Sequence, residues 1–250
     1  MRCFPNRLIG IRQITYSSWG HMLHTVNLTE TYENYLEAIY NMHDEASATG
    51  QKVINARLAD RLGVKPPTVS QTLQRMARDG FVKFDNGDII LTKQGAEIAE
   101  ASIRRHRIIE RFMSDILNIE WAVAHREAER LQHAVSDLIE ARMLAALGHP
   151  KTCPHGNPIP GMQSTRLPDD AILLSQAAPN QRVEILRITE EGERDPRLLD
   201  YLQKQGLIPG ACIVVQEVVD YTGVVSFTKD GAPIALGLKA ARTIWVKPAA

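Results

Sequence analysis

The chain has 250 residues, of which 44% are hydrophobic and 23% charged, a composition typical of globular proteins with two or three small cores. Its 29 basic and 29 acidic side chains cancel, which excludes a protein that coats nucleic acid through overall positive charge. Three widely spaced cysteines argue against a disulfide framework and favour the cytoplasm, and no apolar run is long enough to predict a membrane span.

The first predicted helix begins after Thr29, which can cap it. Its apolar stripe consists of Tyr32, Leu36, Ile39 and Tyr40. Residues 1–21 lack the apolar core of a signal peptide, and residues 1–26 precede the helix. We therefore expect them to form a disordered extension, with Met22 as an alternative start.

The pattern of residues 53–92 predicts a winged helix-turn-helix. Asn55 is a candidate cap for a first helix that ends at Gly63. A second helix begins at Pro66-Pro67, where the missing N–H of proline costs nothing. Its apolar positions are Val69, Leu73 and Met76. An Asn86-Gly87 turn then joins the two short strands of a hairpin.

The second helix of this motif is the predicted DNA-reading element, because its outward side chains form hydrogen bonds. We expect Thr68, Ser70 and Gln71 to contact base edges and phosphates in a major groove. Pro67 is placed to contact a thymine methyl group. Residues 52–84 hold seven basic side chains and two acidic ones, which is a footprint for phosphates. The candidates for phosphate contacts are Arg57, Arg61 and Arg75.

Two long amphipathic helices are predicted after the wing, the first over residues 93–119 and the second over residues 121–147. Gly148 ends the second helix. Long apolar faces outside a winged-helix unit need a partner surface, so we expect a homodimer that reads two-fold symmetric DNA.

These helices carry metal-ligating residue types at helical spacing. His106 and Glu110 lie on one face of the first helix, although a solvated face is the commoner reason for such a pair. The second helix carries His125, Glu129, Gln132 and His133. The loop of residues 149–161 then adds Cys153 and His155, which are either two ligands or a buried cysteine beside a surface histidine.

The C-terminal part changes in composition. Residues 163–179 are predicted to be a linker, and a turn with Glu190, Glu191 and Glu193 follows the first strand beyond it. One helix, over residues 196–205, interrupts five β-rich runs. The runs are residues 183–188, 213–215, 224–227, 232–236 and 244–246. The sequence therefore predicts a mainly α fold with a small β-barrel at its end.

Several segments together resemble the diphtheria-toxin-repressor family of metal-dependent transcriptional regulators. They are residues 30–40, 67–72, 105–107 and 148–161. The resemblance covers about residues 27–247 and implies a winged helix-turn-helix domain, a helical metal-binding and dimerisation domain, and an SH3-like FeoA-type barrel. The expected boundaries are 27–95, 96–162 and 180–250, with the linker at 163–179.

The function that this resemblance implies is that of a non-enzymatic regulator, expected to repress genes of metal homeostasis. Its expected partners are double-stranded operator DNA and a second copy of the chain, with no membrane and no small-molecule substrate. The resemblance further implies two neighbouring metal positions. The first would use His106, Glu110, His125, Cys153 or His155, and Glu190 with Glu193. The second would use Glu37, Glu129, Gln132 and His133.

The sequence departs from the family pattern at the second position. Asn34 and Gln132 stand where members usually carry charged or sulfur ligands, and amides are poorer ligands. Glu129 stands where iron-responsive members carry cysteine, which favours Mn²⁺ as the effector because Mn²⁺ prefers oxygen donors. Fe²⁺ is the alternative.

Three other functions compete with this interpretation. A metallohydrolase would need a general base and a substrate-positioning loop, and every candidate base is already used as a ligand. Nucleophilic catalysis by Cys153 with His155 would need a third orienting residue, and none is evident. The third competitor is a metal-independent winged-helix regulator. Its DNA binding would not respond to a chelator, whereas that of a metal-dependent regulator would.

Overall fold

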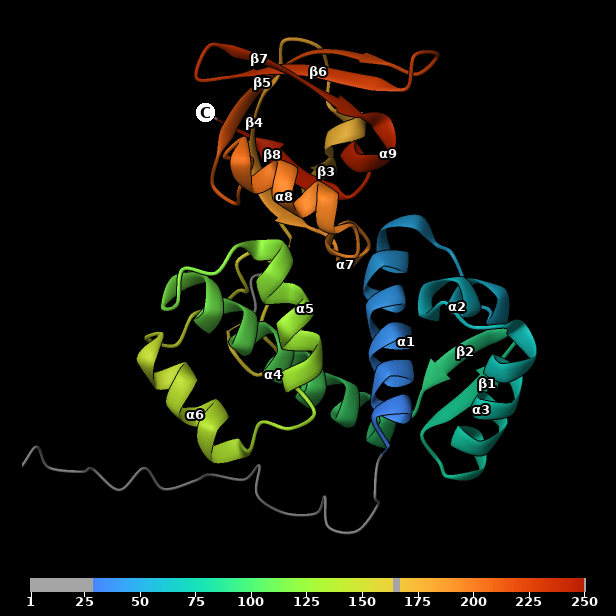
Figure 1. The fold of residues 1–250 in the computed structure, drawn as a ribbon. Helices are drawn as coiled ribbons and strands as arrows, with labels where there is room; N and C mark the ends of the chain where they lie inside the picture. Colours follow the sequence, from blue (N-terminus) through green and yellow to red (C-terminus); the bar gives the residue numbers. More distant parts are fainter. Residues whose placement is uncertain (1–28, 164–166, 250) are drawn as a thin grey trace, which may run out of the picture.

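A computed structural model describes residues 29–163 and 167–249, so the extension predicted for residues 1–26 lies outside the described residues. The described chain forms a winged helix-turn-helix unit, a helical unit, and a β unit that lies above both in Figure 1. No helix in these ranges is long and apolar enough to cross a membrane.

The winged helix-turn-helix unit consists of α1 (Glu30–Thr49), α2 (Asn55–Leu62), α3 (Pro66–Arg78), β1 (Val82–Asp85) and β2 (Asp88–Leu91). Its core contains the predicted Leu36, Ile39, Val69, Leu73 and Met76, all buried. Thr29 Oγ1 accepts the N–H of Tyr32 at 3.3 Å, which confirms the predicted cap. Gly63 ends α2 at φ 65°, and Asn86 and Gly87 have the positive φ values that the hairpin turn requires.

The predicted cap at Asn55 is wrong. Ile54 occupies the N-cap position of α2 and makes no side-chain cap bond. Asn55 is already inside the helix, and its Nδ2 donates to Ser70 Oγ of α3 at 2.5 Å. Its amide therefore joins the two helices of the motif, a tertiary use that local propensity does not reveal.

The helical unit consists of α4 (Lys93–Asp115), α5 (Trp121–Leu131) and α6 (Asp137–Ala146). The single helix predicted for residues 121–147 is therefore wrong. Ser136 accepts the N–H of Ile139 at 3.4 Å, and the acidic side chains of Asp137 and Glu140 lie in the first turn of a new helix. The helix predicted for residues 93–119 ends earlier, at Asp115, and Leu117 beyond it has 53% of its surface exposed.

The β unit is a six-stranded antiparallel sheet with strand order β3-β8-β4-β5-β6-β7 among the described residues. Its strands are β3 (Ile172–Leu173), β4 (Arg182–Ile188), β5 (Cys212–Val219), β6 (Val224–Lys229), β7 (Ala232–Gly237) and β8 (Ile244–Pro248). The short helices are η1 (Leu174–Gln176), α7 (Glu190–Glu193), α8 (Pro196–Lys204) and α9 (Leu238–Ala241). The five predicted strands and the predicted helix are all present.

Part of the segment predicted as a linker belongs to this sheet. Ile172 and Leu173 pair with Val246 and Trp245 of β8, and Leu174 is buried in the core of the β unit. Two residues of strand give too short a pattern to detect in the sequence. The β unit also packs on the helical unit, since Trp121 of α5 is buried in the same core.

Candidate metal centre

Side chains from four separate segments converge on one buried cluster. They are His106 and Glu110 of α4, His125 of α5, Cys153 and His155 of the following loop, and Glu193 of α7. Two sets of three ligand atoms each lie within 4.8 Å of one another, one formed by His106, Glu110 and His125, the other by Glu110, Cys153 and His155. Glu110 belongs to both sets and is completely buried.

Glu110 is the centre of this ligand cluster, as the distances from its Oε1 atom show. His125 Nδ1 lies at 2.7 Å, His106 Nε2 at 3.1 Å and His155 Nδ1 at 3.7 Å. Glu193 Oε1 lies 3.0 Å from His155 Nδ1 and 4.0 Å from the sulfur of Cys153. Two carboxylates, three imidazoles and one thiol thus face a common point.

The charges in the ligand cluster balance one another. Burial opposes ionisation of Glu110, yet His106 and His155 hold its pKa well below the usual range. Burial also opposes protonation of His106, but the adjacent Glu110 raises the pKa of this imidazole to about 10. Burial raises the pKa of the Cys153 thiol to about 11. Protonated His106 and His155 therefore stabilise the ionised Glu110, and a divalent cation would take the place of these protons.

These donors fit a transition-metal ion. Histidine nitrogen, carboxylate oxygen and thiol sulfur are the ligand types that such ions take in proteins. Glu110 Oε2 and His155 Nε2 are buried and have no hydrogen-bond partner within residues 29–163 and 167–249. Buried polar atoms are rarely left unpaired, and an ion is one common reason.

Backbone bonds and arginine side chains hold the loop of residues 149–161 in place. Arg111 donates to the carbonyl of Cys153 at 3.2 Å, and Arg107 donates to that of Pro158. The N–H of Ile188 in β4 donates to the carbonyl of His155 at 2.9 Å. The loop ligands are therefore fixed to both α4 and the β unit.

Gly156 lies where this loop packs against the backbone of β4. Its φ is +90°, and an added Cβ would lie 2.3 Å from the carbonyl oxygen of Leu186. We expect Gly156→Ala to displace the loop and to weaken metal binding at least about tenfold, since misplaced ligands cost that much. Metal titration against a chelating dye measures the change.

Gly210→Ala is the matched control for this substitution. Gly210 has φ +89° but nothing within 4 Å of its added Cβ, so it has the same backbone strain without the collision. Equal metal affinities of the two variants would contradict the role given to the Gly156 contact.

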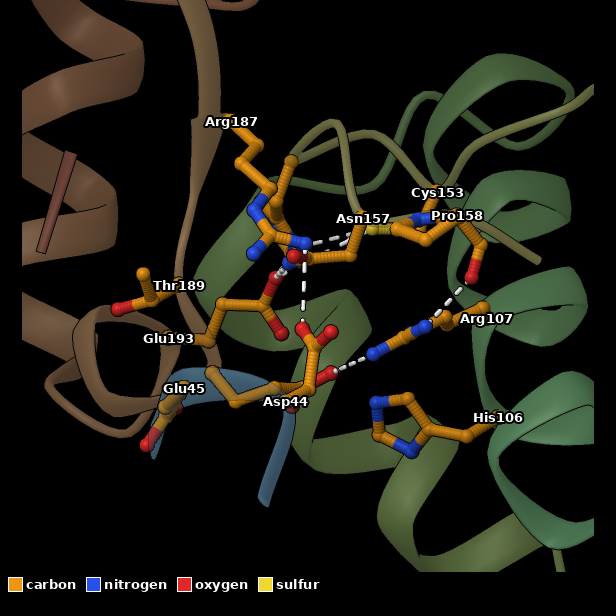
Figure 2. A network of polar contacts seen from close by, with 12 residues as sticks. Asp44, Glu45, His106, Arg107, Cys153, Asn157, Pro158, Arg187, Thr189 and Glu193 are labelled. Atoms are coloured by element: carbon orange, nitrogen blue, oxygen red, sulfur yellow. Dashed lines mark hydrogen bonds and ion pairs between the residues drawn. The ribbon is translucent and has the colours of Figure 1, made fainter. Parts of the chain in front are cut away.

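The acidic residues of α7 divide differently from the prediction. Glu193 is buried in the ligand cluster and accepts from Asn157 Nδ2 at 2.5 Å. Glu190, predicted as the first ligand from this segment, instead pairs with Arg107 Nη2 at 2.5 Å (Figure 2 shows Arg107). Arg107 was not among the predicted functional residues, although it directly follows the candidate ligand His106 in the sequence.

A second polar group connects α1 with the helical unit. Glu37 accepts from the hydroxyl of Ser102 and from Gln132 Nε2, the latter at 2.9 Å. Gln132 Oε1 lies 2.6 Å from His106 Nδ1, so one amide links both groups. Burial raises the pKa of Glu37, which the polar neighbours oppose.

Three residues discussed for the second metal position have other surroundings than predicted. His133 Nδ1 lies 2.5 Å from Oε2 of Glu33, a residue that was not predicted although it lies one helical turn before Glu37. Asn34 is exposed on α1. The Glu129 side chain is 60% exposed, and its Oε1 lies 3.7 Å from His125 Nε2. Glu129 thus borders the first cluster and not the second group.

The predicted DNA-reading residues also separate into two kinds. Pro67, Thr68, Gln71 and Arg75 are all exposed on α3. Ser70 is half-buried against Asn55.

Two of the predicted phosphate contacts have protein partners. Arg57 donates to the carbonyl of Lys52 at 2.8 Å. The Arg61 side chain is only 9% exposed and pairs with Glu45 and Glu191, so its phosphate contact stays a prediction that these ion pairs disfavour.

Three family models match the chain in order along its length. Residues 27–87 match the N-terminal DNA binding domain of the iron dependent repressor, and residues 92–161 match its metal binding and dimerisation domain. Residues 172–248 match the FeoA domain. The predicted resemblance and the predicted fold class are confirmed by these matches.

Whole-chain comparisons give the same result. The iron-dependent repressor IdeR of Mycobacterium tuberculosis is 36% identical over 200 residues, covering 76% of this chain and 85% of that protein. The diphtheria toxin repressor of Corynebacterium diphtheriae is 31% identical over 229 residues, covering 88% and 98%. A solved manganese-dependent transcriptional repressor in complex with manganese superposes with TM-score 0.73 and 33% identity, covering 87% of this chain and 100% of that structure. An IdeR structure from T. acidophilum gives 0.69 at 26% identity, covering 90% and 100%.

Proposed function

Because this chain belongs to the diphtheria-toxin-repressor family of metal-dependent transcriptional repressors, we propose that Mn²⁺ is its effector and that the His106–Glu110 cluster holds the ion. The observation that carries the proposal is the buried convergence of three imidazoles, two carboxylates and a thiol on one point. The proposed ligands of the ion are His106, Glu110, His125, Cys153, His155 and Glu193. When bound, the ion supplies the positive charge that lets the carboxylates approach.

Mn²⁺ is favoured because the neighbouring second group offers only oxygen and nitrogen. Its members are Glu33, Glu37, Gln132 and His133. Oxygen-rich sites suit Mn²⁺, whereas Cys153 in the first cluster is a softer donor that suits Fe²⁺ or Zn²⁺. Fe²⁺ is therefore the second candidate, in line with the iron-dependent relatives.

The switch that we infer acts through α1. Glu37 is hydrogen-bonded to Gln132, and Gln132 to the ligand His106. The same helix contributes Leu36 and Ile39 to the core of the winged helix-turn-helix unit. A displacement of His106 on metal binding would therefore be transmitted to the DNA-binding unit through two hydrogen bonds and α1. An ion that binds only the compact arrangement increases its population in proportion to the difference in affinity.

Homodimerisation is proposed to use the helical unit. Of the eleven exposed large hydrophobic side chains in the described part of the chain, five lie in this unit, namely Ile116, Leu117, Leu131, Leu138 and Ile139. An interaction surface needs such side chains to form a contiguous apolar patch, and the helical unit holds more of them than either other unit. Two α3 helices in a two-fold dimer would then read two DNA half-sites.

A metal titration tests the proposed function. Metal-stripped protein is titrated onto a duplex from the region upstream of its own gene, at fixed salt, by fluorescence anisotropy. We expect Mn²⁺ to produce tight binding that a chelator reverses. If only Fe²⁺, under anaerobic conditions, produced tight binding, Fe²⁺ would be the effector in place of Mn²⁺. Equal binding with and without metal would refute the switch.

A further inference from the structure

The helix α7 reaches three other segments through three acidic side chains. Glu193 lies in the metal-ligand cluster, as described above. Glu190 pairs with Arg107 of α4 at 2.5 Å. Glu191 pairs with Arg61 of α2, with 2.9 Å between Nη1 and Oε2. The segment of the β unit that offers a candidate ligand therefore also contacts the helix-turn-helix directly.

Residues at the end of α1 complete this contact. Glu45 accepts from Arg61 at 3.3 Å and from the backbone N–H of Glu191 at 3.2 Å. One residue earlier, Asp44 pairs with Arg187 of β4 at 3.2 Å, and Figure 2 shows this pair between α1 and the strand. Two ion-pair contacts therefore join the end of α1 and α2 to the β unit.

The geometry of α7 is tightly fixed. Thr189 caps it by accepting the N–H of Gly192 at 3.4 Å. A Cβ added to Gly192 would lie 2.7 Å from Thr243 Oγ1, so the helix packs closely on its own domain. The helix α7 has only four residues, and Thr189 and Thr243 hold it. A displacement of Glu193 would therefore move Glu191 as well.

We propose that the docked β unit positions the helix-turn-helix for operator binding through three residues, Arg61, Glu45 and Glu191. We call these residues the α7 clasp. This inference rests on the proposed function, because a bound ion would favour the docked arrangement that brings Glu193 to the cluster. In a metal-activated repressor, the arrangement that the metal favours is the one that binds DNA. The docked β unit leaves Thr68 and Gln71 of α3 exposed, so it does not block the reading surface.

Burial explains why this clasp uses Arg61 in particular. Its side chain is 9% exposed and lies between two carboxylates, whereas the Glu191 side chain is 52% exposed. The guanidinium of arginine stays charged when it is buried. Its ion pairs are then stronger than exposed ones, because solvent screens them less. In this proposal Arg61 is therefore a positioning residue within the DNA-binding unit.

Glu191→Gln tests the clasp with little risk to folding, since this side chain is half-exposed and isosteric with glutamine. Glu184→Gln is the matched control, because Glu184 pairs with Lys247 within the β unit at 3.1 Å. In Mn²⁺-saturated protein we expect Glu191→Gln to weaken operator binding about fivefold, and Glu184→Gln to leave it unchanged. The double variant with Arg61→Gln should bind no more weakly than Arg61→Gln alone.

A second measurement uses metal-free protein. Hydrogen–deuterium exchange should be faster in α7 and at the end of α1 in Glu191→Gln than in Glu184→Gln, because the clasp no longer restrains these segments. Unchanged operator affinity and unchanged exchange in Glu191→Gln would overturn the proposal, as would tighter operator binding by that variant without metal. If wild-type protein shows no metal response, the proposed function fails, and the exchange experiment still decides whether the clasp joins the two units.

Discussion

Replacing Glu110 with alanine is expected to abolish metal-dependent operator binding, with at least about a hundredfold loss of affinity at saturating Mn²⁺. Glu110 Oε1 is the atom that three imidazoles of the cluster share, at 2.7, 3.1 and 3.7 Å. Loss of a shared anionic ligand costs more metal affinity than loss of a supporting partner, which typically costs about 10–100-fold. Fluorescence anisotropy with a metal-stripped sample and added Mn²⁺ measures the effect.

Folding must be separated from metal binding in this experiment. Glu110→Gln keeps the volume of the buried side chain and removes only its charge, so it should lose the metal response while retaining the circular dichroism of the wild type. Glu97→Ala is the control on the same helix, because Glu97 pairs with exposed Lys93 and is remote from the cluster in sequence. An unchanged metal response in Glu110→Gln would remove Glu110 from the site.

The extent to which the sequence predicts this protein depends on the range of each interaction. Gly63, Asn86-Gly87 and the apolar stripes act within a few residues, so pattern and turn chemistry place α2, α3 and the hairpin. His106 and Glu110 share a helical face for the same reason. The break between α5 and α6 was missed because the apolar pattern continues through it, although Ser136 followed by Asp137 is a start signal.

Tertiary contacts account for the remaining differences between the predicted surroundings of these residues and those in the structure. Glu190 and Glu193 lie three residues apart, and which of them enters the cluster depends on how α7 docks. Arg61 carries a charge that suits phosphate, yet two carboxylates from distant segments neutralise it. Asn55 suits a helix cap, yet its amide bonds to Ser70 across the motif. In each case the residue type was interpreted from its neighbours in sequence, whereas its partner lies far along the chain.

Gln71→Ala is expected to lower operator affinity by about 30-fold or more, while its affinity for unrelated DNA stays the same. Gln71 is exposed on α3, and a glutamine at a base edge contributes about 1–3 kcal/mol of discrimination. A two-fold dimer makes the contact twice, so the expected cost is about 2–6 kcal/mol for the whole complex. Anisotropy titrations with the operator and with a scrambled duplex of equal length measure both affinities.

Arg75→Ala is the contrasting variant, since Arg75 lies on the same helix and carries a charge but reads no base in our assignment. It should weaken binding to both duplexes alike and lower the slope of log affinity against log salt by about one for each phosphate that the protein no longer neutralises. A Gln71→Ala variant that weakened binding equally to both duplexes would behave like Arg75→Ala. The base-reading role would then pass from Gln71 to another exposed residue of α3, with Thr68 the next to test.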